Sequence, residues 1–309
     1  MRFLITGGAG FIGSALANHL VRHGHSVRVL DDLSAGDATL LDPKIHFTRG
    51  DVEDKPKIWR LLNKIDCVYH LAARVSVPES VLYPREYNKT NVGGTVAIME
   101  AMRDAGIKRV VLASSGAIYG KQAIRRVHEN LLPHPDSPYA ASKLAAESYV
   151  RTIGELWHIE TVSLRIFNAY GPGQPLPPIH APVIPQFIRQ IREAGSLVVF
   201  GNGTQTRDYI YLDDVVEALT LAATAEEVNQ EVINIGTGMG TSINELIRQI
   251  EYITYQKASV VMSPAEPGGV LNLVADTEKA ENALGFQAKI SLKEGLDLLI
   301  KQSKQARVS

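Results

Sequence analysis

The segment RFLITGGAGFIGSALANHL, residues 2–20, most strongly limits how this chain can fold. A short apolar run at residues 2–6 leads into a glycine-rich turn, and a stretch with helical periodicity follows at 13–24. A strand, a glycine turn and a helix in this order open a βαβ unit. Such a unit requires a right-handed crossover and a parallel sheet.

The same alternation continues through the first half of the chain. Further strand-length apolar runs and two helix-length stretches alternate, which predicts an α/β fold with a doubly wound parallel sheet covered on both faces. The strands are expected at 26–32, 44–51, 65–73, 108–115 and 161–171, and the helices at 91–105 and 138–154.

The second half of the chain has a different character. A proline-rich segment at 171–185 predicts a loop and a domain transition, and shorter strands and helices follow it. A chain of 309 residues favours one large domain and a smaller one. We expect a first domain at 1–170, to which segments near 204–240 return, and a smaller mixed α/β domain at 171–309.

The glycine turn matches a dinucleotide-binding fingerprint. Gly7, Gly10 and Gly13 follow G-x-x-G-x-x-G between the first strand and the first helix. Glycines allow a tight turn and close approach of the backbone to a pyrophosphate, which the helix N-terminus attracts. The turn residues, with Phe11 and Ile12, are therefore assigned to a dinucleotide on a Rossmann-type domain.

An acidic residue ends the second predicted strand. A carboxylate at Asp31 can accept hydrogen bonds from the adenosine ribose hydroxyls and repel a 2′-phosphate, which favours NAD over NADP. The alternative is an ordinary turn residue at the end of a strand. Asp32 and Ser34 follow and are assigned to the same end of the cofactor.

Charge and composition exclude several classes of protein. The formal net charge is -1, so no basic surplus favours nucleic acid or an anionic membrane. No run approaches 18 apolar residues. Cys67 is the only cysteine, so no internal disulfide forms. We expect a cytoplasmic protein without a metal site.

Tyr139 and Lys143 lie four residues apart in YAASK. Any helix places such a pair on one face, so the spacing alone fits either a catalytic pair or a solvated surface.

Six motifs in order carry a resemblance to a known family. They are TGGAGFIG, GDV at 50–52, HLAA at 70–73, SSGAIYG at 114–120, YAASK at 139–143 and RIFNAYGPGQ at 165–174. Together the motifs resemble the extended short-chain dehydrogenase/reductases, in the NAD-dependent nucleotide-sugar epimerase/dehydratase branch. Among these the UDP-glucose 4-epimerases are the most similar type. The resemblance covers residues 1 to about 300.

The resemblance implies catalytic roles for three residues. Tyr139 would be the base that takes a proton from a sugar hydroxyl, Lys143 would lower its pKa and hold the nicotinamide ribose, and Ser115 would bridge the two hydroxyls. Lowering a tyrosine pKa from about 10 to near 7 requires about 4 kcal/mol of preferential stabilisation of the phenolate.

The resemblance also implies contacts along the cofactor and between subunits. Asp51 and Val52 would border the adenine, Asn91 would support the active site, and the helices at 91–105 and 138–154 would form a homodimer interface. The path of the cofactor would be lined by Leu71, Ala72 and Ala73.

The residues after Ser115 bear on the reaction. In this family the 4,6-dehydratases carry an Asp-Glu pair where this chain has Gly116 and Ala117. The resemblance therefore favours 4-epimerisation of a nucleotide sugar through a 4-keto intermediate. A dehydratase or reductase of the same family is the alternative, and a non-catalytic dinucleotide-binding module is a further one.

The nucleotide sugar would contact residues of both halves. By resemblance, Asn168 and Arg207 would bind the diphosphate, Phe200 would pass the nucleobase, and Ser76 would shape the loop over the sugar. For Arg207 a salt bridge with a neighbouring aspartate is the alternative.

One segment departs from the family pattern. An arginine and an acid are usual where this chain has Glu266 and Gly269, and a carboxylate there would repel a diphosphate. A shifted loop, another cation or a nucleotide other than UDP would each account for the difference. By resemblance, Leu273 occupies a position where bulky residues restrict the sugar pocket in some epimerases. Leucine is smaller than tyrosine, which leads to the hypothesis that N-acetylated hexosamines fit the pocket.

Overall fold

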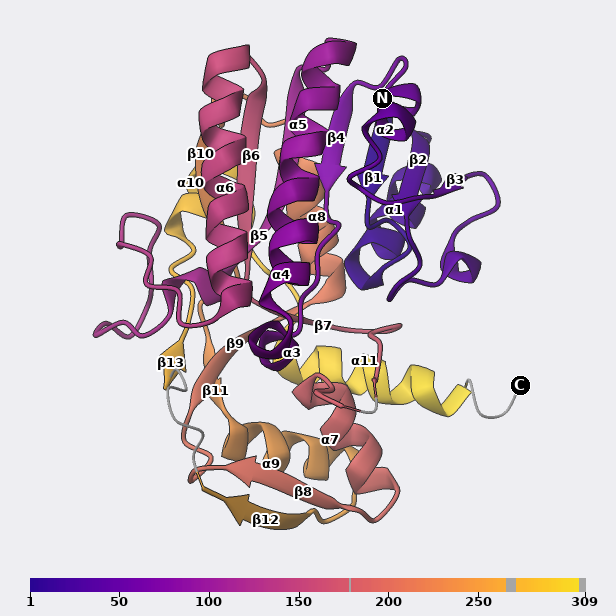
Figure 1. Cartoon of the computed structure of the whole chain (residues 1–309). Coiled ribbons are helices and arrows are strands. Elements are labelled where there is room, and N and C mark those ends of the chain that lie inside the picture. The colour runs from indigo at the N-terminus through magenta and orange to yellow at the C-terminus, as the bar shows by residue number, and fades with distance from the viewer. Residues whose placement is uncertain (178, 265–270, 306–309) are drawn as a thin grey trace.

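A seven-stranded parallel sheet forms the centre of the larger part of the molecule (Figure 1). The computed structural model describes residues 1–177, 179–264 and 271–305. The strand order β3-β2-β1-β4-β5-β6-β10 reverses direction between β1 and β4, where ligands bind in doubly wound folds, at the carboxyl ends of the strands. This confirms the predicted fold class. The strands are β1 (Arg2–Thr6), β2 (Ser26–Asp31), β3 (His46–Arg49), β4 (Cys67–His70), β5 (Arg109–Ser115), β6 (Glu160–Ile166) and β10 (Glu231–Ile235).

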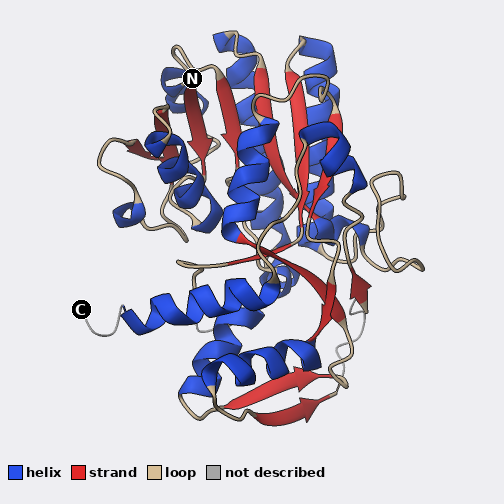
Figure 2. Ribbon diagram, turned by 180° about the vertical axis from the view of Figure 1, so that it is seen from behind, coloured by secondary structure: helices blue, strands red, loops and turns tan. Residues whose placement is uncertain are grey.

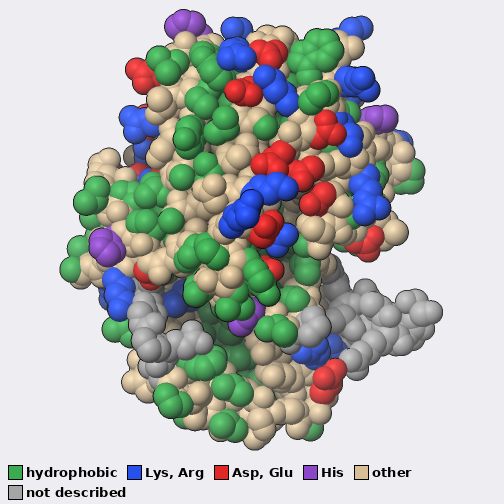
Figure 3. Space-filling view, viewed as in Figure 1, with side chains coloured by type: hydrophobic (Ala, Val, Ile, Leu, Met, Phe, Trp, Pro, Cys, Tyr) green, Lys and Arg blue, Asp and Glu red, His purple; other side chains and the backbone are tan. Residues whose placement is uncertain are grey.

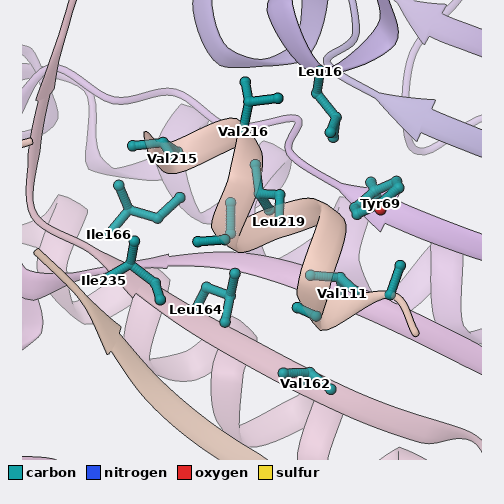
Figure 4. Close-up of a cluster of buried hydrophobic side chains, with 14 of the residues drawn as sticks. Leu16, Tyr69, Val111, Val162, Leu164, Ile166, Val215, Val216, Leu219 and Ile235 are labelled. Atoms are coloured by element: carbon teal, nitrogen blue, oxygen red, sulfur yellow. The ribbon is translucent and has the colours of Figure 1, made fainter. Parts of the chain in front are cut away.

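Helices cover both faces of this sheet. One face packs against α1 (Phe11–Arg22), α8 (Leu212–Ala222) and α10 (Glu278–Leu284). The other carries α2 (Lys55–Leu61), α5 (Gly94–Ala105) and α6 (Pro138–Trp157). Figure 4 shows α8 between α1 and the strands, with Val216 directed towards Leu16 of α1 and Val215 on the side of Ile166 of β6.

The smaller part lies beyond the carboxyl ends of the parallel strands (Figures 1 and 2). Its four-stranded sheet contains β7 (Asn168–Tyr170), β9 (Thr206–Tyr211), β11 (Gly240–Ser242) and β13 (Asn272–Leu273). Strands β8 (Ser196–Phe200) and β12 (Ser259–Ser263) form a separate parallel pair. A second apolar core joins these strands to α7 (Val183–Arg192), α9 (Ile243–Thr254) and α11 (Leu292–Gln305).

Short helical elements connect the layers. After β4 come α3 (Val77–Leu82), α4 (Pro84–Tyr87) and a π-helical segment, Asn88–Gly93, that leads into α5. Such π-helical turns are frequent at functional sites. Short 3₁₀ helices lie at Ala38–Leu40 and Gly116–Tyr119.

The structure corrects two predictions about local structure. The strand expected at 161–171 is two strands, because the chain leaves the parallel sheet at Phe167. The Phe167 amide still donates to Ile235 of β10, but Asn168 pairs with Tyr209 of β9 in the other sheet. The loop expected at 171–185 ends early, since α7 begins at Val183.

The face that carries α5 and α6 mixes charges of both signs (Figure 3). Lys and Arg side chains lie among Asp and Glu side chains on this face of the described residues. Among the described helices, none is long and apolar enough to cross a membrane.

Candidate active site

The glycine turn after β1 is shaped by close backbone contacts. Gly7 has φ +68°, and a Cβ atom there would lie 2.6 Å from the Ala72 amide nitrogen beyond β4. A Cβ atom at Gly13 would overlap the Gly7 carbonyl oxygen. Only glycine fits both places, because any side chain would push β1, β4 and α1 apart. The predicted turn therefore lies at the switch point of the sheet.

The N-terminus of α1 fits a pyrophosphate. Gly10 is the N-cap, no side chain caps the helix, and the first turn has no acidic residue. A Cβ atom at Gly10 would have the Gly7 oxygen, at 3.2 Å, as its only near neighbour. Free amides and open space at a helix N-terminus suit phosphate oxygens. Phe11 and Ile12 begin this helix.

Asp31 joins the end of β2 to the glycine turn. Its carboxylate accepts hydrogen bonds from the Ala9 amide at 3.0 Å and the Leu33 amide at 2.9 Å. Burial raises its pKa, and these two hydrogen bonds oppose the shift. Asp31 thus lies beside the turn, as a ribose-binding acid must. Asp32 is exposed and accepts a hydrogen bond from the Ser34 amide.

The edge beyond β3 and β4 continues this surface. Asp51 is exposed, and its carboxylate accepts a hydrogen bond from the Glu53 amide. Val52 is buried and packs closely against Gly94 of α5. The half-buried residues Leu71, Ala72 and Ala73 follow β4, and the Leu71 and Ala72 amides donate to Thr6 of β1.

Asn91 bridges the loop after β4 to helix α6. Its side-chain oxygen accepts from the Arg74 amide at 2.8 Å, and its nitrogen donates to the Arg74 carbonyl and to the Ser142 hydroxyl. Ser142 in turn donates to the Tyr139 carbonyl at 2.8 Å. The side-chain oxygen and nitrogen of Asn91 thus both form hydrogen bonds within the protein, which fits a supporting role for this residue.

The structure brings Ser115, Tyr139 and Lys143 together. Helix α6 begins at Pro138, with Ser137 as its cap, so Tyr139 lies in the first turn. Tyr139 is 9% exposed and Lys143 5%. The Ser115 side chain, at the end of β5, is hydrogen-bonded to Tyr139. The two helix residues are not part of a solvated face.

The predicted lowering of the tyrosine pKa is not found in the protein alone. Burial raises the pKa of Tyr139, and the hydrogen bond with Ser115 only partly opposes it. Burial also lowers the pKa of Lys143 to about 8, while the charge of Glu147 opposes that shift. The sequence argument counted the positive charges of Lys143 and of the bound nicotinamide ring in a partly desolvated site. In the protein alone, desolvation of the Tyr139 phenolate is the larger effect.

Two side chains missed in the sequence surround this centre. His70 is hydrogen-bonded to Thr6 at 2.7 Å and to Thr95 at 2.9 Å, and burial, with Lys143, lowers its pKa to about 3. It is therefore a neutral link between β1 and α5. Tyr87 packs edge-on against the Tyr139 ring, at a centroid distance of 6.4 Å.

Strand pairing brings two predicted diphosphate ligands near each other. Asn168 on β7 lies opposite Tyr209, two residues from Arg207 on β9. Arg207 forms no ion pair with a described acidic residue. Its guanidinium donates to the Thr206 carbonyl, and burial lowers its pKa, while the charge of Asp136 opposes this shift. The Asn168 amide donates to the Asp208 carbonyl at 3.0 Å, and its side-chain oxygen remains for a ligand.

The other predicted residues lie farther along the same surface or outside it. Ser76 caps α3, and Phe200 ends β8 with 47% of its surface exposed. Leu273 packs in a buried cluster with Tyr119 and Phe167. Glu266 and Gly269 lie outside the described residues. Among the residues described, no cluster of His, Cys, Asp or Glu is placed to hold a metal ion.

Comparison with known proteins identifies the family. Residues 3–236 match the model of the NAD dependent epimerase/dehydratase family. The chain is 38% identical to a putative UDP-glucose 4-epimerase of Methanocaldococcus jannaschii over 299 residues, 96% of each chain.

Solved structures agree with this match. The UDP-glucose 4-epimerase of Thermotoga maritima with UDP-glucose superposes with a TM-score of 0.95 at 36% identity, covering 99% of this chain and 100% of the other. The dTDP-glucose 4,6-dehydratase of Streptomyces venezuelae with NAD superposes with a TM-score of 0.92 at 30% identity. The match covers 100% of this chain and 98% of the other. The chain thus belongs to the NAD-dependent epimerase/dehydratase family, and its cofactor is NAD.

Proposed function

We propose that the protein inverts the configuration of a UDP-sugar at C4 through a 4-keto intermediate. The observation that carries this choice of reaction is the pair Gly116 and Ala117, which offers no acid or base for elimination of water. A Cβ atom at Gly116 would already lie 3.1 Å from the Phe167 ring. The packing therefore disfavours an acid at this position, and a dehydratase reaction lacks its catalyst.

Tyr139 is the proposed base. Its hydroxyl takes the C4 hydroxyl proton of the sugar, and Ser115, hydrogen-bonded to it, orients both groups. Lys143 supplies positive charge that favours the phenolate and binds the nicotinamide ribose. Bound NAD supplies the hydride acceptor and returns the hydride. Because burial raises the tyrosine pKa, a charged Lys143 is essential to the proposed mechanism.

Arg207 and Asn168 are the proposed ligands of the diphosphate. Arg207 is half-buried and forms no ion pair within 4 Å of a described carboxylate, so its guanidinium suits phosphate oxygens, which it can bind through paired donors. Phe200 would contact the nucleobase and Ser76 the loop over the sugar. The names of the relatives favour uridine as the base.

Product analysis tests the reaction and the substrate together. We expect UDP-glucose to give UDP-galactose by NMR when purified protein is incubated with UDP-glucose, UDP-N-acetylglucosamine, dTDP-glucose and GDP-mannose. A 4-keto-6-deoxy product would instead identify a dehydratase, and no product from any sugar would contradict the proposal.

Substitution of the proposed base is the second test. Tyr139→Phe should reduce turnover by about 10³-fold, because a positioned base contributes about 10²–10⁴. Bound NAD should be retained. Tyr255→Phe, at a tyrosine that is 91% exposed and lies at the end of α9, is the matched control and should keep full turnover. Equal loss in both variants would remove Tyr139 from its role.

A homodimer through α5 and α6 accompanies this proposal. The two helices lie side by side on one face, and Tyr149 and Leu156 on α6 are 47% and 69% exposed. Light scattering should give twice the mass of the chain, and Leu156→Glu should shift it to the monomer.

A further inference from the structure

A buried ion pair joins the catalytic helix to the strand beside it. Glu147 lies one helical turn after Lys143 on α6, and Arg165 lies on β6. Arg165 Nη2 is 2.6 Å from Glu147 Oε1, and Arg165 Nε is 3.1 Å from Oε2. The two side chains are 5% and 7% exposed. This is a bidentate pair of the strong, geometrically specific kind.

Further hydrogen bonds fix the pair on both sides. The Ser114 hydroxyl, next to Ser115 on β5, donates to Glu147 Oε2 at 2.8 Å. Arg165 Nη1 donates to the Tyr119 hydroxyl at 2.8 Å, which donates to Asn234 Oδ1 on β10 at 2.7 Å. The charges are therefore held at set positions among α6 and three strands of the sheet.

The pair adds little stability by itself, since buried ion pairs are often no better than apolar residues of the same volume. Its effect on a neighbour is different. Removal of one partner leaves an uncompensated buried charge, and such a charge acts strongly on other groups in a low dielectric. Lys143, itself buried, is the cation one turn away on the same helix.

We propose that Glu147 is a positioning residue that keeps Lys143 protonated beside Tyr139, both by attracting its ammonium group and by neutralising Arg165. The proposal deepens the proposed function, on which it rests. Without Glu147, two buried cations would repel each other, and Lys143 would release its proton more easily. With Glu147 alone, an unpaired carboxylate would hold the Lys143 proton more tightly.

The other titratable groups around α6 do not replace this pair. His70 on β4 is neutral, and the Tyr87 hydroxyl on α4 donates to Glu79 of α3. The remaining charged groups on the packed elements pair with each other or are exposed: Lys89 with Glu53, Glu100 with Lys55, Arg103 with Asp104, Arg109 with Glu160, and exposed Arg85, Glu86, Arg151 and Glu155.

The test measures the Lys143 proton directly. In holoenzyme with ¹³Cε-labelled lysine, the Lys143 signal is assigned by its absence in Lys143→Met and followed by NMR against pH. We expect Glu147→Gln to lower the titration midpoint by about one pH unit or more. The alkaline limb of the kcat profile should move down with it.

Three further variants separate charge from structure. Glu160→Gln removes the acid of the exposed Arg109–Glu160 pair and should leave the midpoint unchanged. Arg165→Met should raise the midpoint, so it tests the proposal even if Glu147→Gln does not fold. In the double variant Glu147→Gln/Arg165→Met, the Lys143 midpoint should return most of the way from its Glu147→Gln value to the wild-type value.

Two results would overturn the proposal. One is a folded Glu147→Gln protein whose Lys143 titrates as in the wild type. The other is a double variant shifted as far as the single one, which would exclude neutralisation of Arg165. Because the midpoint needs no turnover, it is informative even if no nucleotide sugar reacts, an outcome that would count against the proposed function alone.

Discussion

The proposed cofactor side and the proposed substrate side of the site differ in whether backbone or side-chain atoms form them. On the cofactor side, backbone atoms form the surface of the glycine turn. Gly7 and Gly13 are required there because neighbouring main-chain atoms leave no room for a Cβ atom. On the substrate side, Asn168 and Arg207 project from two paired strands. Changes on the first side should therefore disturb folding and cofactor together, whereas changes on the second should weaken substrate binding alone.

Gly13→Ala should produce the largest disturbance. Alanine normally stabilises a helix relative to glycine, but here its methyl group would overlap the Gly7 carbonyl oxygen. We expect a loss of about 3 kcal/mol in unfolding free energy, together with loss of bound NAD. Urea unfolding and the NAD content of the purified protein measure both. Gly195→Ala, whose Cβ atom would have its nearest neighbour at 3.5 Å, should change neither.

Lys143→Met should raise stability while it abolishes turnover. Burial lowers the Lys143 pKa from 10.5 to about 8, so the folded protein binds fewer protons than the unfolded chain between these values. The charged lysine therefore opposes folding fully below pH 8, by about 3 kcal/mol, and this opposition fades as pH rises towards 10.5. Urea unfolding of both proteins at pH 7 and 10.5 should show the gap closing; a constant gap would contradict burial as its cause.

Arg207→Met should act on the substrate side alone. Loss of a charge-assisted, paired contact to phosphate should raise KM for the nucleotide sugar about 30-fold, with NAD content and unfolding free energy little changed. Arg207→Lys keeps the charge without the paired donors, so its KM should lie between those of the wild type and Arg207→Met. If Arg207→Met lost NAD as Gly13→Ala does, the contrast between the two sides would fail.

Asp31→Asn should give the smallest effect and tests whether side chains matter on the cofactor side. The amide keeps one acceptor but loses the charge that binds the Ala9 amide, so we expect about tenfold weaker NAD binding by calorimetry. Asp42→Asn is the matched control, because Asp42 also accepts a hydrogen bond from the amide two residues on, that of Lys44, and is not among the residues assigned to the cofactor. Equal effects would contradict a specific role for the Asp31 carboxylate.

The sequence predicts the fold around the glycine turn well because its signals are local. The first strand, the glycine turn and the acid at Asp31 follow one another within about thirty residues, and each has a simple physical reason. The proposed catalytic pair is local too, since Tyr139 and Lys143 share one helix. What the sequence could not give is the pKa of the tyrosine, which depends on how deeply the rest of the fold buries it.

Contacts between distant segments were missed for the same reason. The Glu147–Arg165 pair joins residues 18 apart, and the Thr6–His70 bond joins residues 64 apart. An arginine within the apolar strand SLRIF was the available signal, because a cation there needs a buried partner. The break at Phe167 carries no glycine or proline, so nothing in the local pattern marks the change of sheet.

That break has a consequence for engineering. The chain passes from β6 to β7, returns through β9 and α8, passes again from β10 to β11, and comes back through β13 to α10. The proposed substrate-binding lobe therefore consists of several separate chain segments, and no single cut within the described residues separates it from the larger part. Exchanging this lobe between homologues would require every junction between the two parts to match. New sugar preferences are therefore better sought by point substitutions within the lobe.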